Sequence, residues 1–381
     1  MKRILLGQLG SNGDCLYATT IARQIKHDFP GCHLTWAISD LCREVIKNNP
    51  HVDEVWEVGV GKWLNMRETW KTFEQEVWRS VKTGEYDHVF TTQIFPNQFC
   101  NYDGTVRPSI FRNYPRPITV PVDPVIVLTD DEKEKVRGWY QTAGLNNFEK
   151  VVLFECSSKS GQSFVTPSLA VKIAENVLTK NPDIAFVIST HEKVGTQHPQ
   201  IFHGGHLSMR ETAELTLYCD LFAGCGSGLT VVSTSTAAKS QLPNLQILNG
   251  STSVYASFKH DFEFFDLPSG HFLETTESEP SLLADTILSM LDDGVDAARE
   301  KFGAEIDAEF TWYLSVIERS LVQSEQYVDA AQSLAITINR YGATRELVRF
   351  AAEKVLPFCD QDQRAQFKAG KKSISELRAL V

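Results

Sequence analysis

The first thirty residues restrict the fold more than any other part of the chain. An apolar strand over residues 3–6 leads into a glycine-rich loop over 10–14, and a helix is expected from about residue 15 to residue 28. Strand, glycine-rich loop and helix in this order are typical of the first βα unit of a parallel sheet. In such sheets ligands bind at the carboxyl ends of the strands. The pattern therefore places one carboxylate, Asp14, at the edge where a catalytic base would lie.

Strands and helices continue to alternate along roughly the first three quarters of the chain. A second series begins near Lys150, with a buried strand over 151–155 and further strands expected over 185–190, 220–223 and 245–248. Two such series predict an α/β protein of two facing Rossmann-like domains, with the ligand in the cleft between them. We expect an N-terminal Rossmann-like domain over 1–148, a C-terminal Rossmann-like domain over 149–293, and a helical extension over 294–381.

Composition excludes several classes of protein. The chain is 42% hydrophobic and 22% charged, which is globular composition, and its formal charge of −11 lacks the basic footprint of a nucleic-acid binder. The eight cysteines form no Cys-x-x-Cys pair, which favours reduced thiols in a cytoplasmic protein and argues against a zinc module. No apolar run is long enough to span a membrane, so any membrane contact would be peripheral.

The loops suggest a group transfer from a nucleotide sugar. Such a transfer needs a base for the acceptor hydroxyl, for which Asp14 is suited, and groups that stabilise a departing diphosphate. Small-residue loops at helix starts offer backbone N–H groups for the second task, and two of them follow strands of the second series. We therefore expect the diphosphate to lie at Ser157, Ser158 and Lys159 and at Gly226, Ser227, Gly228 and Thr230. No Asp-x-Asp motif follows an apolar strand, so we expect neither a metal nor a further cofactor.

Structural interpretations of the same residues stay open. Asp14 is also placed to act as an N-cap of the helix, Ser227 to cap a tight turn, and Lys159 to be a solvated loop lysine. A helix expected over 63–82 is more typical of core packing, with Trp63 a lesser candidate for contact with a ligand. The glycines at 7, 10 and 13 have the wrong spacing for a dinucleotide fingerprint.

The chain resembles glycosyltransferase family 9, the bacterial heptosyltransferases of lipopolysaccharide synthesis. In the first half the resemblance rests on the turn Ser11–Asp14, the helix end Phe29-Pro30-Gly31 and the strand Leu34-Thr35-Trp36. In the second half it rests on residues 153–159, on Leu207-Ser208-Met209 and on Ser227-Gly228-Leu229-Thr230. The matches are collinear over roughly the first 290 residues.

The resemblance implies a metal-independent, inverting glycosyltransferase of the GT-B type. It implies a nucleotide-sugar donor on the C-terminal domain and a lipopolysaccharide, glycan or glycolipid acceptor on the N-terminal one. The enzyme would be cytoplasmic, at the inner face of the membrane. Asp14 would be the general base, and the acceptor-side loop would consist of Gly10, Ser11, Asn12 and Gly13.

Three donor contacts of that family are altered. The family's aspartate stands at Gly226 and its histidine at Val231, while its donor-side lysine falls near Gln162. Its ribose-side glutamate aligns with Arg210 or, one position on, with Glu211. Lys159 would then supply the missing positive charge.

Two other functions remain open at this point. A nucleotide-sugar epimerase would use the same fold without an acceptor. A degenerate transferase would act as a binding or scaffold subunit, with self-association or partner docking through residues 294–381.

Overall fold

The computed structural model describes residues 1–156, 158–303 and 306–381. By its internal contacts the chain divides into two compact units. The first unit consists of Met1–Arg43, Pro50–Pro121 and Glu309–Val381, and the second of Glu44–Asn49 and Val122–Ala308. The 294–381 segment expected as an extension is thus divided, since the chain from residue 309 onward packs into the same unit as the N-terminal strands.

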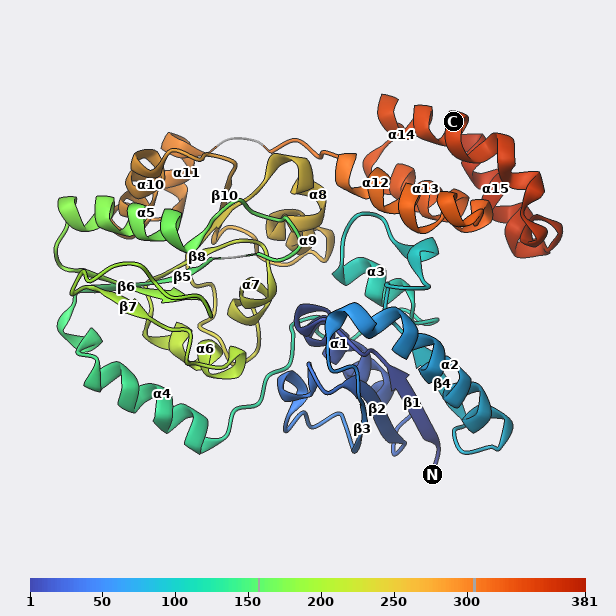
Figure 1. Ribbon diagram of the computed structural model, residues 1–381, viewed down its shortest axis with the longest axis horizontal. Helices are drawn as coiled ribbons and strands as arrows, with labels where there is room; N and C mark the ends of the chain where they lie inside the picture. The colour runs from blue at the N-terminus through green and yellow to red at the C-terminus, as the bar shows by residue number, and fades with distance from the viewer. Residues whose placement is uncertain (157, 304–305) are drawn as a thin grey trace. The chain divides into compact units, whose positions relative to one another are not determined.

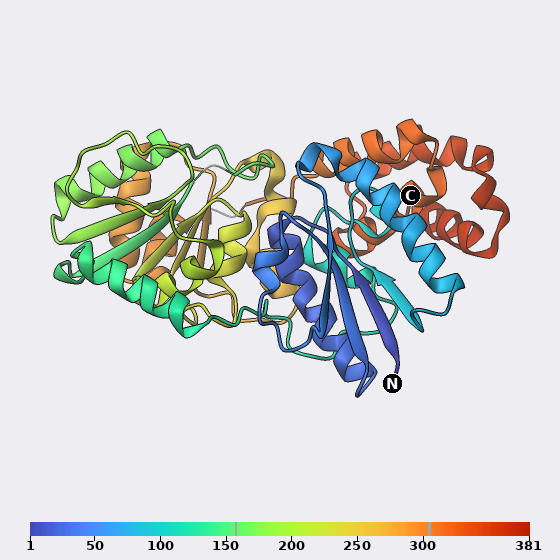
Figure 2. The ribbon, with the colours of Figure 1, turned by 60° about the horizontal axis from the view of Figure 1, so that its bottom comes forward.

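The first unit is built on a parallel sheet with the strand order β3-β2-β1-β4. Helices α1 and α2 lie on its two sides (Figure 2), and the apolar residues of α2 pack on the face that presents Leu5 and Ala37. The elements are β1 (Arg3–Gly7), α1 (Asn12–Asp28), β2 (His33–Ser39), β3 (Glu54–Val58), α2 (Met66–Lys82), β4 (His88–Thr91) and α3 (Arg107–Arg112).

The second unit holds a longer parallel sheet with the strand order β10-β9-β8-β5-β6-β7. Its strands are β5 (Lys150–Glu155), β6 (Ile184–Ser189), β7 (Ile201–His203), β8 (Leu221–Gly224), β9 (Asn244–Ile247) and β10 (Phe272–Thr275). Its helices are α4 (Asp130–Thr142), α5 (Pro167–Lys180), α6 (Met209–Leu215), α7 (Gly228–Ser233), α8 (Ser253–Ala256), α9 (Phe258–Phe264), α10 (Pro280–Asp292) and α11 (Val295–Phe302).

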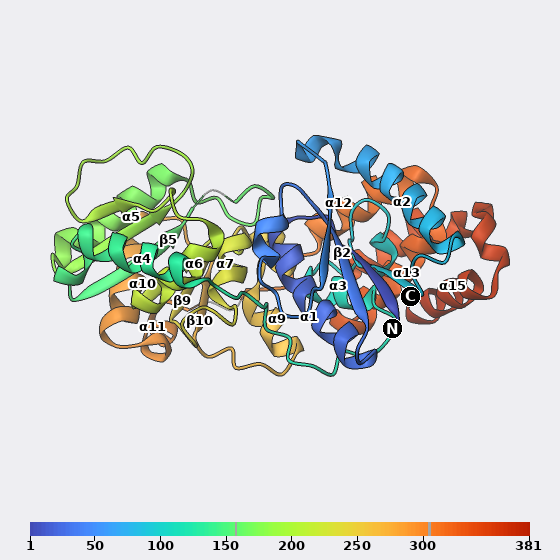
Figure 3. The same ribbon diagram turned by 90° about the horizontal axis from the view of Figure 1, so that it is seen from below.

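Successive side chains of β5 point to opposite faces of the sheet, so the apolar core of the second unit lies on both faces. Val152 and Phe154 pack with α5 and α10, whereas Val151 and Leu153 pack with the α4 and α6 side (Figures 1 and 3). Both faces are covered, as is usual for parallel sheets. The expected α/β class with two Rossmann-like parallel sheets is confirmed.

Two expected elements differ in length from the prediction. The apolar pattern over residues 229–239 predicts one helix, but α7 ends at Ser233, where the hydroxyls of Ser233 and Thr234 donate to the carbonyls of Thr230 and Val231. Such bonds compete with helix continuation. The pattern over residues 41–48 also predicts a helix, and the structure has a short 3₁₀ turn there, Arg43–Ile46.

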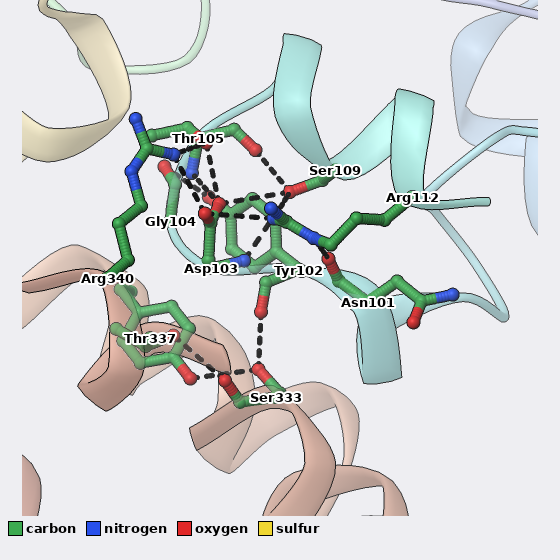
Figure 4. Close-up of polar contacts among 11 residues, drawn as sticks. Asn101, Tyr102, Asp103, Gly104, Thr105, Ser109, Arg112, Ser333, Thr337 and Arg340 are labelled. Carbon is green, nitrogen blue, oxygen red and sulfur yellow. Dashed lines mark hydrogen bonds and ion pairs between the residues drawn. The ribbon is translucent and has the colours of Figure 1, made fainter. Parts of the chain in front are cut away.

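The last helices complete the first unit. They are α12 (Thr311–Ser320), α13 (Tyr327–Tyr341), α14 (Arg345–Phe350), which continues as a π-helical turn over Ala351–Val355, and α15 (Lys368–Leu380). Figure 4 shows how α13 is attached to the loop before α3: Arg340 and Arg112 form ion pairs of 2.8 and 2.9 Å with Asp103, which is fully buried. Burial alone would raise the pKa of Asp103, but the two guanidinium groups hold it below its ordinary value.

Among the described residues, the structure contains no helix that is both long enough and apolar enough to cross a membrane.

Candidate functional site

The strand order reverses direction at one point in each sheet, between β1 and β4 in the first unit and between β5 and β8 in the second. Ligands of parallel α/β proteins bind beyond the carboxyl ends of the strands at such points. The predicted acceptor-side residues follow β1, and most of the predicted donor-side residues follow β5 and β8.

In the first unit Asp14 lies in the first turn of α1. The N-cap residue is Ser11, so Asp14 is inside the helix, and the interpretation of Asp14 as the N-cap is wrong. The Ser11 hydroxyl donates to Oδ1 of Asp14 at 3.1 Å. Desolvation raises the pKa of Asp14 to about 6, and the hydrogen bonds from Ser11 oppose this rise without cancelling it. A partly buried carboxyl with this pKa can take up and release a proton near neutral pH.

Two buried glutamines hold the loop that carries Gly10, Ser11, Asn12 and Gly13. Oε1 of Gln93, directly after β4, accepts hydrogen bonds from the backbone N–H groups of Leu9 (2.7 Å) and Gly10 (3.0 Å). Nε2 of Gln8 donates to the Gly10 carbonyl at 2.9 Å. Neither glutamine was predicted, although a polar residue directly after a buried strand is the signal that would have indicated Gln93.

Trp63 limits what the chain can place at position 10. A Cβ atom at Gly10 would lie 2.8 Å from the ring of Trp63, so a side chain there would displace the ring. Trp63 is 47% exposed and is a surface residue beside the acceptor-side loop, whereas Trp70 and Phe73 of the following helix α2 are buried, as expected of core packing.

In the second unit a carboxylate that was not predicted organises the donor-side loop. Glu155, the last residue of β5, is 3% exposed. Its Oε1 accepts hydrogen bonds from the Ser227 hydroxyl and the Leu229 N–H, and its Oε2 accepts from the Cys225 N–H and the Thr230 hydroxyl. A charged residue that ends an otherwise apolar strand is the sequence signal for this position.

Gln246 of β9 supplies a further acceptor to the same loop. Its Oε1 accepts from the Gly226 N–H at 2.7 Å and from the Thr230 hydroxyl at 3.2 Å. Gly226 has a φ of +63°, and a Cβ atom there would lie 2.9 Å from the Ala256 carbonyl oxygen, which explains the glycine. The N–H group of Gly226, which was expected to face a diphosphate, therefore binds a protein side chain instead, as do those of residues 225 and 229.

The loop after β5 lies beside the loop after β8. The Cys225 thiol donates to the Glu155 carbonyl at 3.2 Å, and the Ser158 hydroxyl bonds with the Ser163 backbone in the adjoining turn. Lys159 is exposed, whereas Gln162 is buried and its Oε1 accepts from the Ser160 N–H at 3.1 Å. Ser157 lies outside the described residues.

Glu211 caps α6. It forms a capping box with Ser208, and its Oε1 accepts from Lys135 at 2.7 Å. Desolvation would raise the pKa of Glu211, but these bonds hold it below its ordinary value. The start of α6 is next to the donor-side loop, because a Cβ atom at Gly228 would lie 3.1 Å from the Met209 side chain.

One cavity of the second unit lies away from these residues. Lys259, Glu274 and Arg299 are among its lining residues, and it contains none of the predicted site residues.

Comparison with known proteins shows similarity of fold. No family model matches the sequence. No curated protein matches it either. Among solved structures, the glycosyl transferase family 9 protein from Veillonella parvula DSM 2008 matches with a TM-score of 0.50 and 15% identity, over 78% of this chain and 94% of that one. The ADP-heptose lps heptosyltransferase II of E. coli matches with a TM-score of 0.51 and 13% identity, over 76% of this chain and 98% of that one.

A further similar structure is a UDP-N-acetylglucosamine 2-epimerase, with a TM-score of 0.48, 9% identity, and coverage of 91% of this chain and 97% of that one. The expected resemblance to glycosyltransferase family 9 is thus supported at the level of fold.

Proposed function

We propose that this protein is a glycosyltransferase in which Asp14 is the general base for an acceptor hydroxyl and the second unit binds a nucleotide-sugar donor. The observation that carries the proposal is the Asp14 carboxyl, which lies at the strand-order reversal of the first sheet with a pKa of about 6. A general base is most effective when its pKa lies near the working pH. Direct attack of the activated hydroxyl on the sugar would invert the configuration.

The donor side of the proposal rests on the two adjoining loops after β5 and β8. Since several of their N–H groups bind Glu155 and Gln246, neutralisation of the diphosphate falls to the exposed ammonium group of Lys159 and to backbone groups of the loop over 158–162. We propose no metal or further cofactor for this step. The acceptor we propose is a hydroxyl of a lipopolysaccharide precursor or another surface glycan, reached from the cytoplasmic side of the membrane.

One observation favours a second candidate, a degenerate transferase that acts as a binding or scaffold subunit without transfer activity. The Glu155 carboxylate is hydrogen-bonded to Ser227 and Thr230, in the loop that would hold a diphosphate. The negative charge of this carboxylate would repel a diphosphate bound at the loop and weaken its binding.

A product assay distinguishes these functions. The protein is incubated with sugar conjugates of ADP, UDP, GDP and CMP, with and without a glycolipid extract as acceptor, and both nucleotides and sugars are analysed. We expect release of nucleotide that depends on the acceptor, as a transferase requires. An epimerised nucleotide sugar formed without acceptor would identify an epimerase, and nucleotide binding with no product under any condition would identify a binding subunit.

A further inference from the structure

The outer face of α15 carries a group of cations. Lys368, Lys371, Lys372 and Arg378 are exposed, and spacings of three and four residues place the lysines on one side of the helix. The opposite side, with Ile374 and Leu377, is buried where α15 packs on α13 (Figure 1). The position of α15 is therefore fixed by its apolar side, and its cations point away from the first unit's core.

A large aromatic side chain stands next to these cations. Phe367, the N-cap residue of α15, is 67% exposed. Phe358, in the 3₁₀ turn Leu356–Gln361, is also partly exposed and stacks on Tyr327, with 5.4 Å between the ring centroids. An exposed phenylalanine beside lysines is typical of helices that lie at a membrane surface, where the ring enters the headgroup region and the ammonium groups meet lipid phosphates.

The local charge differs in sign from that of the whole chain. Residues 367–381 contain the four cations and one carboxylate, Glu376, which lies 3.6 Å from Lys372, whereas the chain as a whole has a formal charge of −11. An anionic surface repels most of this protein and attracts this face. The charge distribution therefore favours an anionic partner and orients the protein with the cationic face of α15 toward it.

We propose that the outer face of α15, together with Phe367, binds the surface of an anionic lipid bilayer. The lysines interact with the acidic headgroups and the Phe367 ring inserts between them. This inference does not depend on the proposed function, because the contact lies on α15 and uses no residue of the candidate site.

Vesicle sedimentation with the full chain tests the inference. The probes are vesicles of phosphatidylcholine alone and vesicles that also contain phosphatidylglycerol. We expect binding to the anionic vesicles, none to the neutral ones, and release when salt is raised from about 0.1 M to about 0.5 M, since screening shortens the range of the attraction. Each lysine near an anionic membrane accounts for about fivefold in affinity, so the double change Lys371→Glu and Lys372→Glu is expected to lower binding more than tenfold.

Two further variants complete the test. Phe367→Ser is expected to weaken binding several-fold while leaving its salt dependence intact. The matched control is the double change Lys172→Glu and Lys193→Glu, which reverses two exposed lysines of the second unit and should leave binding within twofold. Absence of binding to anionic vesicles at low salt, or an equal loss in the control, would overturn the proposal. Circular dichroism of each variant identifies any loss caused by unfolding.

Discussion

The two sheets carry carboxylates at comparable places, and the surroundings of these carboxylates differ. Asp14 follows β1 and Glu155 ends β5, each beside the point where the strand order reverses. Glu155 accepts four hydrogen bonds from a loop 70 to 75 positions further along the chain, whereas among the described residues the hydrogen bonds to the Asp14 carboxyl come from Ser11 and from the Asp14 backbone, in its own helical turn. A carboxylate that accepts hydrogen bonds from a distant loop holds that loop in place, while one whose pKa is raised by desolvation can exchange a proton near neutral pH.

The comparison shows that position in the topology is not enough to assign a role. Both residues would be selected by a rule that looks for acids at the carboxyl edge of a parallel sheet. The origin of the hydrogen-bond donors separates them, because those of Glu155 come from a loop distant in the sequence and those of Asp14 from its own helical turn. The predictions below test this separation.

The largest effect is expected for the proposed general base. Asp14→Asn should lower transfer activity by roughly 100- to 10,000-fold, because an amide cannot accept the proton of the acceptor hydroxyl. Steady-state rates with donor and acceptor at saturation measure it. Glu155→Gln should keep a larger share of the turnover rate at saturating donor. If Asp14→Asn retained near-normal turnover, the assignment of Asp14 as a base would fail.

A third carboxylate, Asp103, extends the comparison to a fully buried group that is paired with two arginines. Arg340→Met removes one of its two ion pairs and should lower the free energy of unfolding by about 3 kcal/mol, the low end for breaking a buried pair, because Arg112 remains. Urea denaturation measures this. The exposed Arg319→Met on α12 is the control and should change stability by less than about 0.5 kcal/mol. If the two changes lowered stability equally, the loss could not be attributed to the buried ion pair.

Glu155→Gln should lower the free energy of unfolding by about 2–4 kcal/mol, because the amide nitrogen faces donors and leaves them unmatched. It should also weaken nucleotide binding, since the loop over 224–230 loses its anchor. Chemical denaturation and calorimetry with nucleoside diphosphates measure the two effects. Glu149→Gln, at an exposed position before the same strand, should change neither. A stable Glu155→Gln with normal binding would show that the hydrogen bonds of Glu155 do not hold the loop.

The raised pKa of Asp14 predicts a pH-dependent cost in stability. The folded state holds this proton up to about pH 6, whereas the unfolded chain releases it near its ordinary value of 3.8, so folding stability falls as the pH rises between these values. Asp14→Asn should therefore be more stable than the parent by about 1–3 kcal/mol at pH 7.5 and nearly equal to it at about pH 4. Thermal unfolding at both pH values measures the difference. A constant difference across this range would mean that Asp14 has an ordinary pKa.

The smallest effect concerns the donor cation. Lys159→Ala should weaken the binding of nucleoside diphosphates by about tenfold, as expected for loss of one charge-assisted hydrogen bond. Calorimetry with ADP, UDP, GDP and CDP measures it, with Lys172→Ala as the control. Unchanged binding of every nucleotide would place the diphosphate away from the loop over 158–162.

Local sequence signals were sufficient for the two sheets. Apolar runs such as residues 151–154 and the glycine-rich loop before Asp14 predict strands and their carboxyl ends, which the structure confirms. The partners of Glu155 could not be predicted, because they lie 70 to 75 positions further along the chain. Gln162 illustrates the same limit, since its alignment with a donor-side lysine says nothing of its burial within its own loop.

The last helices show the limit most clearly. Their apolar faces suggested an interface with another molecule, but the buried residues of α13 pack within the first unit, and Arg340 reaches an aspartate 237 positions earlier. Periodicity indicates that a helix has a face to bury and leaves open which surface will cover it. The self-association expected through 294–381 therefore stays a prediction without this argument in its favour.

The attachment of Arg340 to Asp103 also determines when the first unit can finish folding as the chain is made. A ribosome adding about 5–20 residues per second needs roughly 10–50 s to travel from Asp103 to Arg340. Throughout that interval Asp103 lacks one of its two arginine partners, and the surface that α13 will cover stays open. The second unit, whose segment over 122–308 is synthesised within the interval, can complete its own sheet first. The part of the chain that leaves the ribosome first is therefore the part that reaches its final structure last.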